Sequence, residues 1–320
     1  MIPIWFVYAL LTAVVYAGIA LLAKVVSGTE IDDPITLTIY SCVPFYAVYV
    51  VAGLALEPTT ISGIAVTDPT PVSAVLTALA FGVVSTVGYG IYYLGLVSGD
   101  VSRFVPALAI ETIFVLALGF LLLEESFPAG VYGGVLLVVF GALFISYEHG
   151  GGSLRGTVGP STIGVAVAAA AAFAVLNTGI KVLTTEFGTL EILFWISVGG
   201  LASVTAIAPF REGARFRPAV DSSDVLSWRL SRGTTLLVVG GLLNAVALLT
   251  FVRALETGPV SLATAITKLD VMLVFIGSLS LSKLTPQLLT EQFDPFTLFQ
   301  KGTASVVILV GCVLIQFGSG

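Results

Sequence analysis

The sequence predicts an all-α polytopic membrane protein, with ten transmembrane helices arranged as two inverted repeats of five helices. Composition is the first observation behind this prediction. Hydrophobic residues make up 57% of the chain and charged residues only 10%, with a mean hydropathy of +1.07, whereas a soluble domain carries about 25% charged residues. The second is the length of the apolar runs, and the third is an internal repeat.

The apolar runs are long enough to cross about 30 Å of hydrocarbon. Turn residues separate the most closely spaced neighbours: Gly99 follows the third run, and Gly258 with Pro259 follows the eighth. In order, the expected helices cover residues 3–26, 35–56, 72–97, 102–122, 129–147, 161–183, 189–210, 233–256, 259–282 and 301–318. Uniformly apolar runs of this length favour helices over membrane strands.

A glycine-rich stretch at 148–160 divides the chain into a first repeat over 1–147 and a second over 161–320. Lys24 and Lys181 end the first helix of each half and lie 157 residues apart in the sequence. Glu111 and Asp270 lie 159 residues apart, and each follows a turn glycine by twelve residues. This nearly constant offset indicates a duplication.

Five helices are an odd number, so two successive five-helix halves cross the membrane in opposite directions. Transporters with such inverted repeats bind their substrates near the middle of the membrane, where the repeats meet. The second half also contains an insertion at 284–300, whose spaced leucines and phenylalanines predict an amphipathic element along the membrane interface.

Several short motifs resemble those of the EamA-like ten-helix transporters of the drug/metabolite transporter superfamily. They are a lysine at the end of the first helix of each half (Lys24, Lys181), a proline in the fourth helix (Pro106), and an acidic residue after it with glycines beyond (Glu124, Gly133, Gly134). In the second half Lys283 and Ala265 stand where Glu124 and Pro106 would be. The resemblance implies secondary transport of a small metabolite or drug-like compound through a central cavity by alternating access.

Glu111, Lys268 and Asp270 are charged residues within apolar runs, where insertion scales put the cost of a charge at about 2.5–3.5 kcal/mol. Each carboxylate has two interpretations: it binds substrate or a coupling proton, or it belongs to a structural ion pair. Residues two apart on a continuous helix are rotated by about 200°, so Lys268 and Asp270 should face different ways. A Glu111–Lys268 pair between the halves, with Asp270 open to the cavity, is the preferred arrangement, and the reverse remains open.

A second set of residues is less specific evidence for a binding cavity. Tyr89, Tyr92, Tyr93, Asn177 and Asn244 lie inside apolar runs and either line the cavity or serve interhelical packing.

Lys24 and Lys181 either extend to the headgroups or take part in gating and anion binding. Glycines in the fifth and eighth helices (Gly133, Gly134, Gly141; Gly240, Gly241) are expected to let helices approach closely.

The leading functional hypothesis is a secondary carrier of a small organic solute. That protons are the coupling ion is a further hypothesis, which rests on Glu111 and Asp270. The alternatives are a membrane sensor or scaffold with the carrier fold, and an intramembrane enzyme. An enzyme would be expected to show a nucleophile–base pair or a metal cluster, and the isolated Cys42, Cys312 and His149 form neither. We expect membrane lipids and a small molecule as partners, no nucleic acid, no cofactor and no metal; the oligomeric state stays open.

The distribution of basic residues predicts the orientation of this multi-pass protein, which we expect in the cell membrane. Ten of the 13 lysines and arginines fall on the side reached after odd-numbered helices, and two fall on the side of the termini. The positive-inside rule therefore places both termini outside. Relatives with ten helices usually have cytoplasmic termini, so the two arguments conflict.

Overall fold

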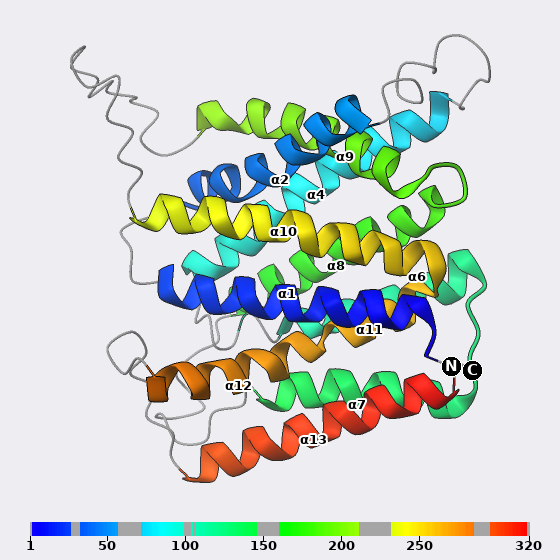
Figure 1. The fold of residues 1–320 in the computed structure, drawn as a ribbon, viewed down its shortest axis with the longest axis vertical. Coiled ribbons are helices and arrows are strands. Elements are labelled where there is room, and N and C mark those ends of the chain that lie inside the picture. The colour runs from blue at the N-terminus through cyan, green and yellow to red at the C-terminus, as the bar shows by residue number, and fades with distance from the viewer. Residues whose placement is uncertain are drawn as a thin grey trace.

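The computed structural model describes residues 2–26, 33–56, 72–98, 104, 107–145, 160–210, 232–284 and 295–318. Every regular element in these ranges is a helix, which confirms the all-α prediction (Figure 1). Eight helices of the described chain are long and apolar enough to cross a membrane, and Leu108–Leu123 and Ala129–Ile145 are shorter apolar helices. These ten segments coincide in order with the ten expected helices.

The α-helices are α1 (Ile4–Val26), α2 (Pro34–Leu56), α4 (Val72–Ser98), α6 (Glu111–Leu123), α7 (Ala129–Ile145), α8 (Pro160–Leu183), α9 (Thr189–Ile207), α10 (Arg232–Thr257), α11 (Val260–Thr267), α12 (Leu269–Leu284) and α13 (Pro295–Gly318). Two 3₁₀ turns, Leu108–Ile110 and Ala208–Phe210, adjoin α6 and α9. Residues 295–300, which were expected within the insertion at 284–300, form the beginning of α13, and the amphipathic element stays a prediction. Residues 285–294 and 148–159 lie outside the described ranges.

The helices run side by side between two opposite faces (Figure 1). In that view α1 begins at the right face, α10 returns to it, and α13 ends there, so both termini lie on the right. Helices from distant parts of the chain pack together: α1 against α10, α2 against α9 and α10, α4 against α8 and α9, and α7 against α13. The two sequence halves are therefore interleaved.

Glycines allow the closest of these contacts. A Cβ atom at Gly134 of α7 would lie 2.8 Å from the Gly311 carbonyl oxygen of α13, and one at Gly241 of α10 would lie 2.5 Å from the Ser41 carbonyl oxygen of α2. Gly141 is equally crowded by Ile308. These three glycines confirm the expected close approach.

The expectation was wrong for Gly133 and Gly240. A Cβ atom at either position would meet nothing within 4 Å, because each glycine is rotated by about 100° from the crowded glycine next to it in the helix. The sequence pattern marked the right helices but could not say which glycine faces the contact.

Two expected helices are interrupted. Residues 259–282 were expected to be continuous, but α11 ends at Thr267 and α12 begins at Leu269. In the fourth expected helix, 102–122, a 3₁₀ turn at Leu108–Ile110 precedes an α-helix that begins at Glu111. At the break between α11 and α12, the Asp270 carboxylate accepts a hydrogen bond from the Val271 N–H at 2.7 Å, a local bond that competes with helical hydrogen bonding. Hydropathy alone does not register such breaks.

Candidate substrate and ion site

Glu111 is the centre of a polar cluster at the start of α6. Its side chain is buried, and each carboxylate oxygen has its own donor. Asn177 of α8 donates to Oε1 through Nδ2 at 2.6 Å, and Lys268 donates to Oε2 through Nζ at 2.7 Å. The expected Glu111–Lys268 ion pair is thereby confirmed, and Asn177 joins it.

The cluster ties three separate parts of the chain together. Charge-assisted hydrogen bonds of this length are about twice as strong as neutral ones, and a buried charge is tolerated only when it is paired. Glu111 lies in the first turn of α6, which continues directly from the 3₁₀ turn Leu108–Ile110. Asn177 supplies a neutral donor, so it orients the carboxylate without changing the charge of the cluster.

Asp270 lies beside this cluster, in the first turn of α12. Its carboxylate interacts electrostatically with Lys268 and Glu111, and its side chain is only partly buried although it lies deep among the helices. The expectation that Lys268 and Asp270 face different ways rested on a continuous helix. Because the helix is broken at Lys268, the ammonium group lies within electrostatic range of both carboxylates.

Two tyrosines complete the surroundings of Asp270. Tyr92 of α4 lies within electrostatic range of Asp270, and Tyr16 of α1 lies within range of both Asp270 and Glu111. Both side chains are partly accessible. Sequence reasoning singled out Tyr92 but missed Tyr16, because one tyrosine in an apolar helix carries no signal that separates a site from ordinary packing.

The remaining aromatic and amide candidates form a neighbouring layer. Asn244 of α10 donates to the Tyr89 hydroxyl through Nδ2 at 2.7 Å, and the Tyr89 ring packs edge-on against Phe173 at a centroid distance of 5.3 Å. Tyr93 shares a side-chain hydrogen bond with Ser41. These contacts fix α4 against α2, α8 and α10, so Tyr89, Tyr93 and Asn244 support the site rather than contact Glu111.

Lys181 lies apart from the cluster. Its ammonium group donates to the Leu255 carbonyl oxygen at 2.7 Å, close to the C-terminus of α10, where a cation stabilises the unpaired carbonyl groups. The side chain of Lys24 is outside the described set. The structure thus brings together Glu111, Asn177, Lys268, Asp270 and Tyr92, and it places Lys181 elsewhere.

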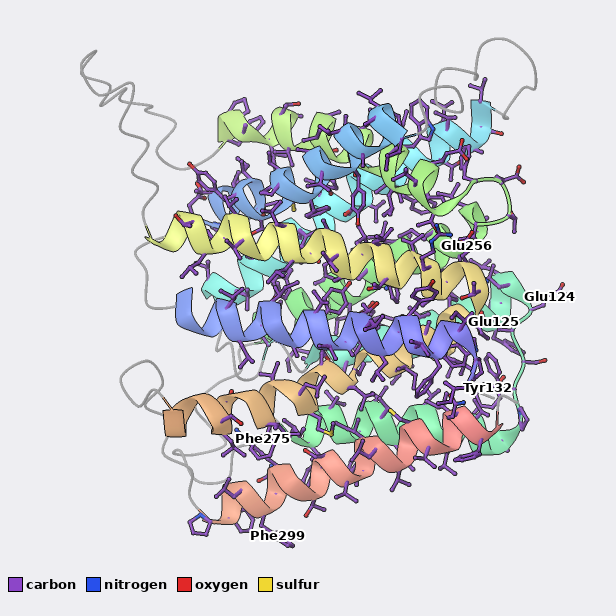
Figure 2. All side chains as sticks on the ribbon, in the orientation of Figure 1. Glu124, Glu125, Tyr132, Glu256, Phe275 and Phe299 are labelled. Atoms are coloured by element: carbon purple, nitrogen blue, oxygen red, sulfur yellow. The ribbon has the colours of Figure 1, made fainter. Side chains whose placement is uncertain are left out.

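Glu125 makes a second polar contact between distant segments, at the right face of the view. Its Oε1 accepts from the Val260 N–H at 2.7 Å and its Oε2 from the Ser261 N–H at 3.2 Å, so it caps the N-terminus of α11. Figure 2 shows Glu124, Glu125 and Glu256 at this same end. Glu256 pairs with Arg253 at 2.8 Å and accepts from Thr189.

No group of three or more metal-ligating side chains is found in the described ranges. Cys42 and Cys312 are buried and free. Glu111, Asp270 and Lys268 contribute two carboxylates and one amine to the cluster.

Comparison with known proteins finds one family model that matches the first part of the chain. The model of the EamA-like transporter family matches residues 3–147, the segment expected to form the first repeat. No curated protein matches the sequence.

One crystal structure of a protein matches with a TM-score of 0.68 and 16% sequence identity, over 97% of this chain and 95% of its own. At this identity the match shows the fold alone. The similarity in fold covers nearly the whole length of both chains.

Proposed function

We propose that the chain is a secondary transporter of a small organic solute that works by alternating access, because residues 3–147 match the model of the EamA-like transporter family. Its substrate and coupling proton bind at the cluster of Glu111, Lys268 and Asp270. One observation carries the proposal: an ion pair deep in the membrane region joins the two halves at a helix break in each.

The pattern of helix neighbours supports two inverted five-helix repeats. Suppose that α1, α2, α4, α6 and α7 correspond in order to α8, α9, α10, α12 and α13. Exchanging the halves then turns each main helix–helix contact into another observed contact or into itself. The α1–α10 contact becomes α8–α4, and α1–α12 becomes α8–α6; α2–α9 and α7–α13 map onto themselves. Such symmetry lets the halves exchange conformations and open first one side and then the other.

The helix breaks support a site at the repeat interface. Glu111 begins α6 and Asp270 is the second residue of α12, and the sequence repeat pairs these two residues. Discontinuous helices in transporters present helix ends to substrate and ions near the middle of the membrane. Backbone freed from regular hydrogen bonding is tolerated there only where it is enclosed by protein or lines a cavity.

Proton coupling follows from the unequal surroundings of the two carboxylates. Glu111 is held by Lys268 and Asn177, whereas Asp270 is partly accessible and accepts from one backbone N–H. Asp270 is thus the group that takes up and releases the proton. Lys268 lies in range of both carboxylates, so its interaction with Asp270 can change as the helices move.

The test is solute-driven proton flux in liposomes that hold the full chain and a pH-sensitive dye. A panel of cationic, zwitterionic and anionic solutes is applied to wild type and to Glu111→Gln and Asp270→Asn variants, with the exposed Glu124→Gln as matched control. We expect at least one solute to drive proton movement in wild type and Glu124→Gln, and Asp270→Asn to uncouple it.

Specific solute binding with no flux under any gradient would replace the carrier by the sensor alternative. Solute flux with unchanged proton movement in the Asp270→Asn and Glu111→Gln variants would retain the carrier and remove these carboxylates from coupling.

A further inference from the structure

The short helix α11 is bonded to the first half of the chain at both of its ends. At its N-terminus the Val260 N–H donates to Glu125 Oε1 at 2.7 Å, and the Ser261 N–H donates to Glu125 Oε2 at 3.2 Å. At its C-terminus Lys268 donates to Glu111 Oε2 at 2.7 Å. Glu111 begins α6 and Glu125 follows its end. The two helices therefore run in opposite directions, and a carboxylate of the first half joins them at each end.

Close packing fixes α6 against α11 between these two bonds. A Cβ atom at Gly119 of α6 would lie 2.5 Å from the Ser261 hydroxyl oxygen and 2.7 Å from Glu125 Oε2. Glu124 ends α6 in the left-handed conformation, with φ of 56°, and the Glu125 N–H donates to the Gly119 carbonyl oxygen at 3.0 Å. All eight residues of α11 are buried, so this helix cannot shift without changing its contacts.

The sequence repeat provides this carboxylate at one face only. At the offset of 159 residues that relates the halves, Ser261 corresponds to Ser102, a residue of the same type. Glu125 corresponds to Leu284, whose side chain cannot accept a hydrogen bond from a backbone N–H. The Glu125 bond is therefore a device of a single face, the one at which the termini lie (Figures 1 and 2).

The turn that leads into α11 is also covered by the first half. A Cβ atom at Gly258 would lie 2.3 Å from Cγ of Trp5, a buried residue near the start of α1. The beginning of α11 is thus held by an apolar ring and by the Glu125 carboxylate. Charge-assisted hydrogen bonds depend on charge and direction, so a single substitution at Glu125 can remove them and leave the apolar contact in place.

We propose that Glu125 is a latch that holds the face of the termini closed, and that α11 couples this latch to the ion pair of Glu111 and Lys268. This inference rests on the proposed carrier function and describes how its central site controls access from one face. When substrate binding breaks the ion pair, α11 is released at its C-terminus. A short rigid helix moves as a unit, so its N-terminus is drawn away from Glu125 and the face opens.

The test measures how fast a cysteine at the latch reacts with N-ethylmaleimide in the purified full chain in detergent. Val260→Cys is the reporter, because the Val260 side chain is fully buried and only its backbone N–H bonds to Glu125. Glu125→Gln removes the charge and replaces one acceptor oxygen by a donor. We expect it to raise the labelling rate at least about tenfold, which corresponds to about 1.4 kcal/mol in the opening equilibrium. Glu124→Gln, at the exposed neighbouring carboxylate, should leave the rate unchanged.

The same reporter measures the coupling through α11. Lys268→Met breaks the ion pair at the far end of the helix, about 12 Å from position 260 at 1.5 Å per residue. It should also raise the labelling rate of Val260→Cys, and it should add little in a chain that already carries Glu125→Gln. Cys42, which is fully buried in α2, reports general loosening, and its peptide should stay unlabelled in every variant.

An unchanged labelling rate in Glu125→Gln would overturn the latch, and so would labelling of Cys42 that rises together with that of position 260. An unchanged rate in Lys268→Met would overturn the coupling. If Glu125→Gln does not fold, Ser261→Ala gives the same comparison, because it removes only the hydroxyl that donates to Glu125 Oε2.

Flux in liposomes separates the latch from the carrier function. If the labelling rates change as expected but no solute is moved, the latch stands and the carrier function fails. If a solute is moved and the labelling rates stay the same, the carrier function stands and the latch fails.

Discussion

Glu111 is satisfied by two donors of different kinds, an ammonium group and an amide, which come from different helices. Each of its carboxylate oxygens accepts one hydrogen bond, so the carboxylate is fixed in position. Asp270, which is two residues beyond the break at Lys268, has a single backbone donor in the described structure. Because of this difference, we propose that Glu111 has a structural role as the partner of Lys268. We propose that Asp270 carries the exchangeable proton.

At the residue scale, removing one partner of the ion pair should cost more stability than removing both. Glu111→Gln leaves the Lys268 ammonium group without its carboxylate, and breaking a buried pair in this way costs about 3–5 kcal/mol. Lys268→Met should cost a similar amount, and the double variant should recover a large part of the loss. Thermal unfolding of the purified variants measures this cycle.

Glu124→Gln, at an exposed carboxylate, controls for the loss of a charge as such. Additive effects of Glu111→Gln and Lys268→Met would mean that the two side chains do not stabilise each other.

The sequence was informative about single residues where a charge interrupts an apolar run. Glu111, Lys268 and Asp270 were identified for that reason, and the Glu111–Lys268 pair followed from the expectation that Lys268 and Asp270 face different ways. Tyr16 was not identified, and Lys181 was grouped with the site although it bonds to the Leu255 carbonyl oxygen. Which way a tyrosine or lysine side chain points depends on the neighbouring helix, and the sequence does not give this.

At the scale of elements, the helix breaks and the glycine contacts decide how the helices fit together. The α6 and α12 helices begin at repeat-related positions and carry their carboxylates in the first turn. The α7 and α13 helices approach each other through Gly134 and Gly311, where a Cβ at Gly311 would lie 2.6 Å from the Gly134 carbonyl oxygen. Small residues at such crossings allow the close packing that holds membrane helices together.

Gly133 and Gly134 form a matched pair for testing this contact. Gly134→Ala should destabilise the protein, because the added methyl group would meet the Gly311 carbonyl oxygen at 2.8 Å and overpacking of this kind costs about 1–3 kcal/mol. Gly133→Ala meets open space and should be neutral or stabilising, by up to about 1 kcal/mol. Thermal unfolding in detergent compares the two.

Equal effects of the two substitutions would contradict the assignment of Gly134 to the α7–α13 contact. A larger loss in Gly133→Ala would place the crossing on the other side of α7.

For the whole molecule, the two halves are interleaved and both termini lie at one face (Figure 1). The α1 helix packs on α10 and α12, and α7 packs on α13, so neither half has its complete set of neighbours without the other. Motion between the halves must therefore rearrange contacts throughout the molecule. The cap that Glu125 provides for α11 lies at the face of the termini and would have to open when that face opens.

Orientation is a whole-molecule prediction. Ile2→Cys and Gly320→Cys variants are labelled in intact cells with a membrane-impermeant maleimide, which can be compared with wild type because Cys42 and Cys312 are buried. We expect both introduced cysteines to be labelled from outside, because the sequence places most basic residues on the side opposite the termini and the positive-inside rule puts that side in the cytoplasm.

Labelling of both cysteines only after permeabilisation would instead support the orientation usual among ten-helix relatives. Labelling of one terminus from each side would contradict ten crossings.

The sequence by itself determined the membrane setting, the helical class, the order of the helices and the charged residues of the candidate site. These follow from hydropathy, run length and the cost of a charge in hydrocarbon, all of which act along the chain. The tertiary structure decided where the helices break, which glycines face a neighbour, and that Asn177 and Tyr16 join Glu111 and Asp270. These depend on which side of each helix meets another, and that is settled only when the helices pack.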